Sequence, residues 1–167
     1  SRQDEQEFQA LDVNRPLESA LLITGQQLID HNISIVKRLA AGLPEILGDS
    51  NQLEQVFLNL IANAMDAMDL AEGQKELNIR SELCEQEKFS SVIVSIKDTG
   101  VGISQENLNK VMEPFFSTKP VGKGTGLGLS LCFSIIESHG GRLEITSQHG
   151  KWTEVKVILP VEVAKKE

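Results

Sequence analysis

Two clusters of glycine lie close together in the second half of the chain, at residues 98–103 and 122–130. Glycine allows the backbone to adopt positive φ angles and lets a ligand approach the main chain closely. A tight hairpin needs only one or two such residues, so turns alone do not account for both clusters. We therefore expect this part of the chain to wrap a nucleotide, with the first cluster at the base and the second at the phosphates.

The second cluster is expected to open a helix, and the free N–H groups at a helix N-terminus bind anions. Its glycines would let those groups converge on the α- and β-phosphates, and its leucines are expected to anchor the turn in the core. The candidate phosphate-binding residues are Gly124, Thr125, Gly126, Leu127, Gly128 and Leu129. A plain glycine-rich loop before a helix is the alternative. The spacing is not that of a Walker motif, which ends in Gly-Lys-Ser/Thr.

A line of polar residues follows one side of a predicted helix. Residues 52–68 carry apolar side chains at three- and four-residue steps, and Asn59, Asn63 and Asp66 lie beside that stripe at i, i+4 and i+7. A solvated face is the simplest interpretation, although asparagine has mediocre propensity in mid-helix. An amide oxygen can instead ligate Mg²⁺ on a nucleotide, which takes only one or two ligands from protein. Asn63 borders the apolar stripe and is the better-placed ligand, with Asn59 second.

The elements that must position these residues follow from periodicity and from capping and turn residues. Helices are expected at residues 14–30, 50–70, a short stretch after 104, and 126–139. Strands are expected at residues 33–39, 75–83, 90–97, 142–147 and 153–159. Asn14 is the expected cap of the first helix, and Asp49 or Ser50 that of the second. The order predicts an α+β fold with about three main helices packed on one face of a mixed, mostly antiparallel sheet.

Composition limits the classes of function. The chain has 167 residues, 40% hydrophobic and 24% charged, as in an ordinary soluble globular domain. A net charge of −8 argues against a nucleic-acid-binding surface. No apolar run approaches the ~18 residues of a membrane helix, and the first residues do not form a signal peptide. Cys84 and Cys132 lie in apolar patterns and are expected to be buried reduced thiols rather than a disulfide.

Four segments together resemble a known family. Residues 59–67 (NLIANAMDA) resemble the N box of the catalytic, ATP-binding domain of sensor histidine kinases. Residues 98–102 (DTGVG) resemble the first glycine box of that family, 113–116 (EPFF) the F box and 124–129 (GTGLGL) the second glycine box. Residues 140–160 are similar to its terminal hairpin. One box would be weak evidence, but four in order at this spacing are a specific signal.

The resemblance covers residues 12–161 and implies a Bergerat-type two-layer α/β sandwich that binds ATP with Mg²⁺. Gyrase, heat-shock chaperone and mismatch-repair ATPases share this wider fold. Residues 162–167 would then form a C-terminal tail, and residues 1–11 either a frayed tail or the end of an upstream helix.

The resemblance also implies a role for each box. Asp98 would accept a hydrogen bond from the adenine amino group, because guanine presents a carbonyl there and two acceptors would face each other. Gly100 and Gly102 would let the backbone pass beside the base, and Ile103 could pack on it. The alternative is an Asp-Thr-Gly turn that closes a strand.

The segment between the two glycine boxes would form a lid. Phe115 and Phe116 would pack this lid down, and either Lys119 or Lys123 would meet the terminal phosphates. An ordinary exposed loop with two core aromatics is the alternative. The resemblance also implies that Thr153 would support the adenine pocket, although Trp152 stands where the family usually has glycine.

The residue one turn before Asn63 separates transfer from hydrolysis. ATPase relatives carry an acid there that activates water, whereas Asn59 has no basic lone pair at neutral pH. With Asn59 and Asn63 as the catalytic pair, this favours transfer of the γ-phosphoryl group, which needs positioning and charge neutralisation above all. Asp66 would either reach Mg²⁺ through water or face solvent.

The phosphoacceptor is expected outside this chain. His31, His139 and His149 lack the family's acceptor pattern and are expected to be caps or surface residues. The expected partners are an upstream dimerisation and phosphoacceptor domain of the same protein and, indirectly, a response-regulator receiver domain. The domain would be cytoplasmic, make no membrane contact and belong to a protein that is either free or anchored in the inner membrane. The alternatives are an anti-sigma-type serine kinase, a true ATPase and a non-catalytic nucleotide sensor.

Overall fold

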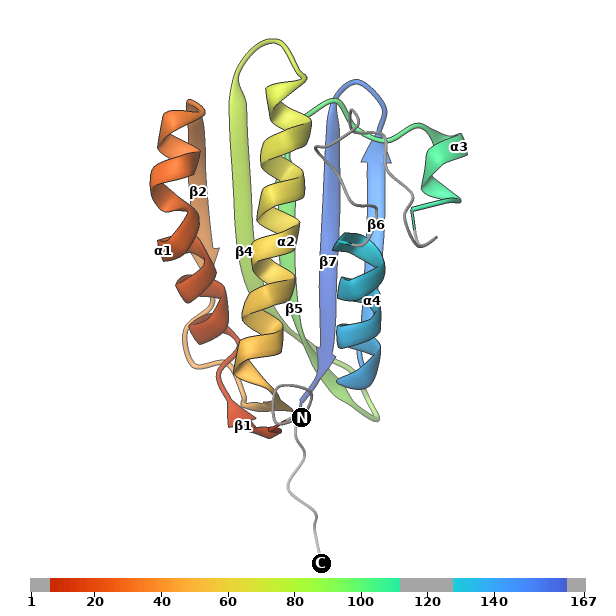
Figure 1. Ribbon diagram of the computed structural model, residues 1–167. Helices are drawn as coiled ribbons and strands as arrows, with labels where there is room; N and C mark the ends of the chain where they lie inside the picture. The colour runs from red at the N-terminus through yellow and green to blue at the C-terminus, as the bar shows by residue number, and fades with distance from the viewer. Residues whose placement is uncertain (1–6, 112–127, 162–167) are drawn as a thin grey trace, which may run out of the picture.

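The computed structural model describes residues 7–111 and 128–161, which form two layers (Figure 1). The helices are α1 (Asn14–Asp30), α2 (Ser50–Asp69), α3 (Gln105–Leu108) and α4 (Gly128–Ser138). The strands are β1 (Gln9–Leu11), β2 (Ile33–Leu39), β3 (Ile46–Gly48), β4 (Lys75–Glu85), β5 (Ser90–Asp98), β6 (Arg142–Gln148) and β7 (Trp152–Pro160).

Five strands form the main sheet, in the order β2-β4-β5-β7-β6. β2 runs parallel to β4, and the other neighbours in this sheet are antiparallel. The helices α1, α2 and α4 lie on one face of the sheet, and the short α3 is set apart from them (Figure 1). This arrangement confirms the predicted α+β fold, with three main helices on one face of a mixed, mostly antiparallel sheet.

The core lies between the two layers, and α2 crosses its centre. The buried side of α2 is the predicted apolar stripe with Met65 added: Leu53, Val56, Phe57, Leu60, Ile61, Ala64, Met65 and Met68. The helix begins where expected, because the Asp49 carboxylate accepts a hydrogen bond from the Gln52 N–H at 3.1 Å. The capped start and the continuous apolar side together fix the orientation of α2, and with it the positions of the polar residues Asn59, Asn63 and Asp66.

The start of α1 differs from the prediction. Val13 occupies the cap position and Asn14 is already helical, so the predicted Asn14 cap is wrong. The Asn14 backbone N–H is instead satisfied by the Asp12 carboxylate at 2.9 Å, and the Asn14 side chain donates to the Ala40 carbonyl oxygen, also at 2.9 Å. The amide thus ties α1 to the end of β2, a long-range contact that the local sequence does not reveal.

A second, two-stranded sheet lies at the lower end of the molecule in Figure 1, where β1 pairs antiparallel with β3. Residues 9–11 are therefore a strand, and not the frayed tail or helix end expected of residues 1–11. β3 was also missed, because three residues are too few to show an alternating pattern. An isolated bridge from Ile46 to Val161 connects β3 to the residue that follows β7.

The structure also bears on the state of the two cysteines and on the lengths of the helices. Cys132 is buried, Cys84 is half-buried, and both are free thiols. Within residues 7–111 and 128–161, no helix combines the length and apolar character needed to cross a bilayer.

Candidate functional site

Several predicted site residues meet at the end of the sandwich where α2 and β5 both finish (Figure 1). Asp98 is the last residue of β5, Asn59 lies at the middle of α2 and Asn63 in its second half. Gly128 opens α4, whose first turn lies near Asn63: a Cβ added at Gly128 would be 3.9 Å from the Asn63 side-chain nitrogen. Segments far apart in the sequence thus bring the N box, the first glycine box and the start of α4 together.

Asp98 is a carboxyl group held in the core side of the sheet. It pairs with Leu77 on β4 and with Thr153 on β7, and only 5% of its surface is exposed. Burial raises its pKa from the ordinary 3.8 to about 6, while a hydrogen bond from the Gly100 N–H, at 2.8 Å, limits the rise. Such a group is costly to ionise and is typical of a functional site.

Hydroxyl groups on the terminal hairpin lie next to this carboxyl. The Ser147 hydroxyl donates to the Trp152 carbonyl oxygen, lies 2.9 Å from the Thr153 hydroxyl and accepts from the Ile103 N–H at 2.7 Å. Thr153 itself is buried and is the partner of Asp98 across the β5–β7 pairing.

Trp152 lies on the opposite face of the sheet from Thr153, because side chains alternate along a strand. Its ring packs beneath the Lys97 ammonium group, 4.6 Å from the ring centroid. The tryptophan in the family's usual glycine position therefore points away from the pocket side of β7.

The glycines of the first box are required by packing. A Cβ at Gly100 would lie 2.6 Å from the Ala67 carbonyl carbon, and the next N–H, from Val101, donates to the Ala67 carbonyl oxygen. Gly102 has a φ of +71°, and a Cβ there would collide with the Gln148 carbonyl oxygen. The loop is wedged between the end of α2 and the β6–β7 turn, a reason for both glycines that sequence reasoning did not supply.

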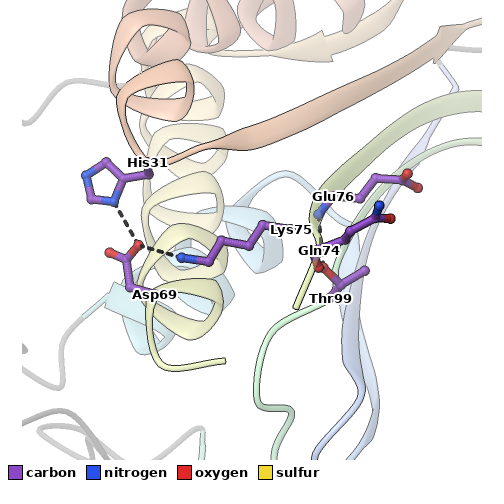
Figure 2. Close-up of polar contacts among 6 residues, drawn as sticks. All are labelled: His31, Asp69, Gln74, Lys75, Glu76 and Thr99. Carbon is purple, nitrogen blue, oxygen red and sulfur yellow. Dashed lines mark hydrogen bonds and ion pairs between the residues drawn. The ribbon is translucent and has the colours of Figure 1, made fainter. Parts of the chain in front are cut away.

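Polar contacts hold the ends of the surrounding elements (Figure 2). The Thr99 hydroxyl accepts from the Glu76 N–H at 2.9 Å and donates to the Gln74 carbonyl oxygen at 3.1 Å, which joins the glycine loop to the start of β4. At the end of α2, the Asp69 Oδ1 atom lies 2.8 Å from the His31 Nδ1 atom and 3.9 Å from the Lys75 Nζ atom. The loop and the helix end are thus fixed by the protein's own groups.

The two asparagines of the N box have different surroundings. Asn59 and Asn63 are both half-buried on α2. Burial raises the pKa of the Cys132 thiol on α4 to about 12, and the nearby Asn59 side chain limits the rise. Asn63, one turn further on, faces the start of α4 at Gly128. Asn59 therefore helps to join the two helices, and Asn63 is the asparagine nearer to the second glycine box.

Part of the second glycine box can be placed. Gly128 is the first residue of α4, and Leu129 packs against the core, as expected of a turn anchor. Asp66 is half-buried on α2. The predicted site residues that lie outside the described residues are Lys119, Lys123, Gly124, Thr125, Gly126 and Leu127, together with the F box at 113–116.

The three histidines were expected to be caps or surface residues. His31 is the residue at which α1 ends, and His149 is exposed in the turn between β6 and β7. His139 follows the last residue of α4 but is only 5% exposed, so the surface alternative is wrong for it.

Most of the chain matches a known protein family. Residues 48–163 match the family of "Histidine kinase-, DNA gyrase B-, and HSP90-like ATPase". The chain belongs to this family. Relatives in the family include the sensor histidine kinase ZraS of Escherichia coli (strain K12), 34% identical over 96% of this chain. Sporulation kinase C of Bacillus subtilis (strain 168) is 41% identical over 70% of the chain. The chain spans 32% and 25% of the lengths of these two relatives.

Solved structures agree with this assignment. The catalytic domain of the histidine kinase ThkA superimposes with a TM-score of 0.75 at 27% identity, over 92% of this chain and 95% of that one. Full-length ShkA, crystallised with AMPPNP, has the same fold, with a TM-score of 0.79 at 22% identity over 96% of this chain and 33% of its own. The chain is thus an ATP-binding catalytic domain of the histidine kinase kind.

Proposed function

We propose that this chain binds ATP at the end of the sandwich marked by Asp98, Asn63 and Gly128, and that it transfers the γ-phosphoryl group to a histidine on a separate domain. The observation that carries the proposal is the buried Asp98 carboxyl, which lies at the same end of the fold as the N box and the opening of α4. Each group has the chemistry that one part of ATP requires.

Asp98 would recognise the base. One carboxylate oxygen already accepts from the Gly100 N–H, so the group is oriented before a ligand arrives. A carboxylate can accept from the exocyclic amino group of adenine, and the carbonyl of guanine would leave two acceptors opposed. Ile103, half-buried beside Gly102, would pack on the ring.

The phosphates would lie at the start of α4. Gly128 begins the described part of α4, and the backbone N–H groups of the second glycine box, with the glycines at 124 and 126, would form an anion site at the helix N-terminus. The Asn63 amide near Gly128 is a neutral oxygen donor of the kind that suits Mg²⁺, with Asn59 as a second candidate. When bound, Mg²⁺ would neutralise charge on the phosphates. Lys119 or Lys123 would add a cation at the γ-phosphate.

Asn59 favours transfer over hydrolysis. It occupies the position from which a carboxylate would activate water, and its side chain lies near the Cys132 thiol on α4. Because this group cannot accept a proton at neutral pH, water attack on the γ-phosphate would lack a general base. An imidazole acceptor brings its own lone pair, so phosphoryl transfer to histidine needs no such base.

The partners follow from the lengths of the relatives. ZraS and sporulation kinase C are named as kinases, and each is more than twice as long as this chain. We infer that residues 12–161 act as a catalytic domain in the cytoplasm, together with a dimerisation and phosphoacceptor domain of the same protein. A response-regulator receiver domain would take the phosphoryl group from that histidine.

The proposal is tested by incubating this chain with γ-labelled ATP, Mg²⁺ and a histidine-bearing phosphoacceptor domain. We expect label on the acceptor that is lost in acid, as phosphohistidine is, and no transfer by Asp98→Asn or Asn63→Ala. Acid-stable label would instead indicate a serine kinase. Release of free phosphate alone would indicate an ATPase, and nucleotide binding without either reaction a nucleotide sensor.

A further inference from the structure

His139 is a buried histidine whose two ring nitrogens each make a hydrogen bond, and the Ser138 hydroxyl also lies 3.4 Å from its Nδ1. Its Nδ1 lies 2.8 Å from the Ile135 carbonyl oxygen, one turn back in α4, and its Nε2 lies 3.0 Å from the backbone nitrogen of Asp49. A carbonyl oxygen can only accept and a backbone N–H can only donate. The imidazole is therefore neutral, with its proton on Nδ1 and an acceptor lone pair on Nε2.

The residue that His139 contacts is the cap of the N-box helix. One Asp49 carboxylate oxygen accepts from the Gln52 N–H in the first turn of α2, and the other accepts from the Glu7 N–H at 3.0 Å. The Asp49 N–H is the group that donates to His139. Asp49 thus joins three segments: α2, the end of α4 and the chain that enters at Glu7.

The surroundings of His139 are closely fitted. The Phe8 ring stacks on the imidazole, with centroids 4.5 Å apart and planes 28° from parallel. On another side, a Cβ added at Gly48 would lie 2.9 Å from the imidazole Cδ2, so the site leaves no room for a side chain at that position. We call Glu7, Phe8, Gly48, Asp49 and His139 the histidine node. It lies at the opposite end of α2 from the nucleotide site (Figure 1).

Between these two ends, α4 lies antiparallel on α2 and contacts it at three levels. At the upper level, Gly128 faces Asn63. Half-way along, the Cys132 thiol lies 3.8 Å from the Val56 carbonyl oxygen and near the Asn59 side chain. The lowest contact is the hydrogen bond between His139 and Asp49. This last bond is a backbone-anchored contact that fixes the position of α4 along the α2 axis.

We propose that His139 is a positioning residue of the nucleotide site: its hydrogen bond to the Asp49 N–H, covered by Phe8, sets where α4 lies along α2 and thereby places Gly128 beside Asn63. The inference rests on the proposed ATP site. This role of His139 also predicts that the chain segment Glu7–Phe8 affects nucleotide affinity without touching the nucleotide. That segment covers the ends of α2 and α4 that lie opposite the proposed nucleotide site.

The test separates the two hydrogen bonds of the imidazole. In His139→Gln the amide oxygen can reach the place of Nε2 and accept from the Asp49 N–H. In His139→Asn the shorter side chain can replace Nδ1 within α4 but cannot reach Asp49. We expect His139→Asn to weaken binding of an ATP analogue with Mg²⁺ by about threefold to tenfold, the range of one net hydrogen bond, and His139→Gln to bind within about twofold of the wild type. Calorimetry gives the affinities, and urea unfolding of each nucleotide-free variant gives its stability.

Controls separate this inference from the proposed function. The matched substitutions Glu137→Gln and Glu137→Asn, at an exposed residue near the end of α4, should leave affinity unchanged. Asp98→Asn should lose affinity whatever His139 does, and if it does not, the proposed site is wrong rather than the role of His139. Equal affinities of His139→Asn and His139→Gln, whether both normal or both reduced, would overturn the positioning role.

The role of His139 can also be tested on the wild-type protein, so the result does not depend on whether a variant folds. If the His139–Asp49 bond favours nucleotide binding, nucleotide binding must strengthen that bond by the same factor. Hydrogen exchange of the Asp49 amide should therefore slow on addition of the ATP analogue, by about threefold to tenfold beyond any change in the amides of β2 at the far sheet edge. Equal slowing of Asp49 and β2, or no slowing at Asp49, would contradict the proposal.

Discussion

At the scale of single residues, the ionised Asp98 carboxyl lowers the stability of the folded chain but is suited to binding a ligand. Its carboxyl group is buried beside Leu77 and Thr153, and its pKa of about 6 means that the folded chain resists its ionisation. A residue that destabilises the empty protein at neutral pH is typical of a position retained for ligand binding.

Replacement of this carboxyl should therefore have opposite effects on binding and on stability. We expect Asp98→Asn to weaken binding of an ATP analogue by about tenfold to a hundredfold, because a hydrogen bond to a charged acceptor is worth about 1.5–3 kcal/mol. The same variant should unfold at a higher urea concentration than the wild type at pH 8, since the nearly isosteric amide has no charge to bury. Lower stability together with normal affinity would contradict the assignment of Asp98 to the site.

At the scale of elements, the site depends on how closely the glycine loop approaches α2. Gly100 lies against the Ala67 backbone, where a Cβ has no space, whereas Gly25 lies within α1 with nothing within 4 Å of an added Cβ. Neither has a positive φ, so the two positions differ in space rather than in backbone conformation.

This contrast predicts opposite outcomes for one substitution. Gly25→Ala should stabilise the protein by about 1 kcal/mol, the difference in helix propensity between the two residues. Gly100→Ala should destabilise it by about 1–3 kcal/mol, because the loop or the end of α2 must shift. Thermal and urea unfolding measure both, and equal effects of the two substitutions would mean that the loop is not packed on α2.

At the scale of the whole molecule, the raised pKa of Asp98 links folding to pH. The folded pKa of about 6 exceeds the ordinary value of 3.8, so the unfolded chain loses this proton first. The stability that protonated Asp98 contributes is complete below about pH 4 and is lost as pH rises through about 6. In the proposed site, the affinity for nucleotide would change with pH in the opposite direction, because the adenine amino group would need the ionised carboxylate as its acceptor.

The part of the pH dependence of stability that is due to Asp98 can be isolated by comparing the wild type with Asp98→Asn at several pH values. The free energy of unfolding of Asp98→Asn, minus that of the wild type, should increase by about 2 kcal/mol between pH 4 and pH 7. Over the same interval, the affinity of the wild type for the ATP analogue should rise. A difference that is independent of pH would show that Asp98 titrates normally in the folded chain.

The local sequence determined the features that depend on neighbouring residues. The apolar stripe of α2, its Asp49 cap, the two hairpins and the glycine boxes are all short-range patterns, and the described structure has α2, both hairpins and the first box where they were expected. Packing on one side of a helix or sheet follows from periodicity, so the two-layer fold was also predictable.

Only the tertiary structure decided the features that join distant residues. His139 and Asp49 are 90 residues apart, and Glu7 and Asp49 are 42 apart, so no local pattern reveals the histidine node or the β1–β3 pairing that holds the entering chain. Likewise, the direction of Trp152 and the tight fit of Gly100 depend on which strand or helix lies alongside. Sequence periodicity specifies which side of an element is buried, but the identity of the atoms that cover it is settled when the elements pack.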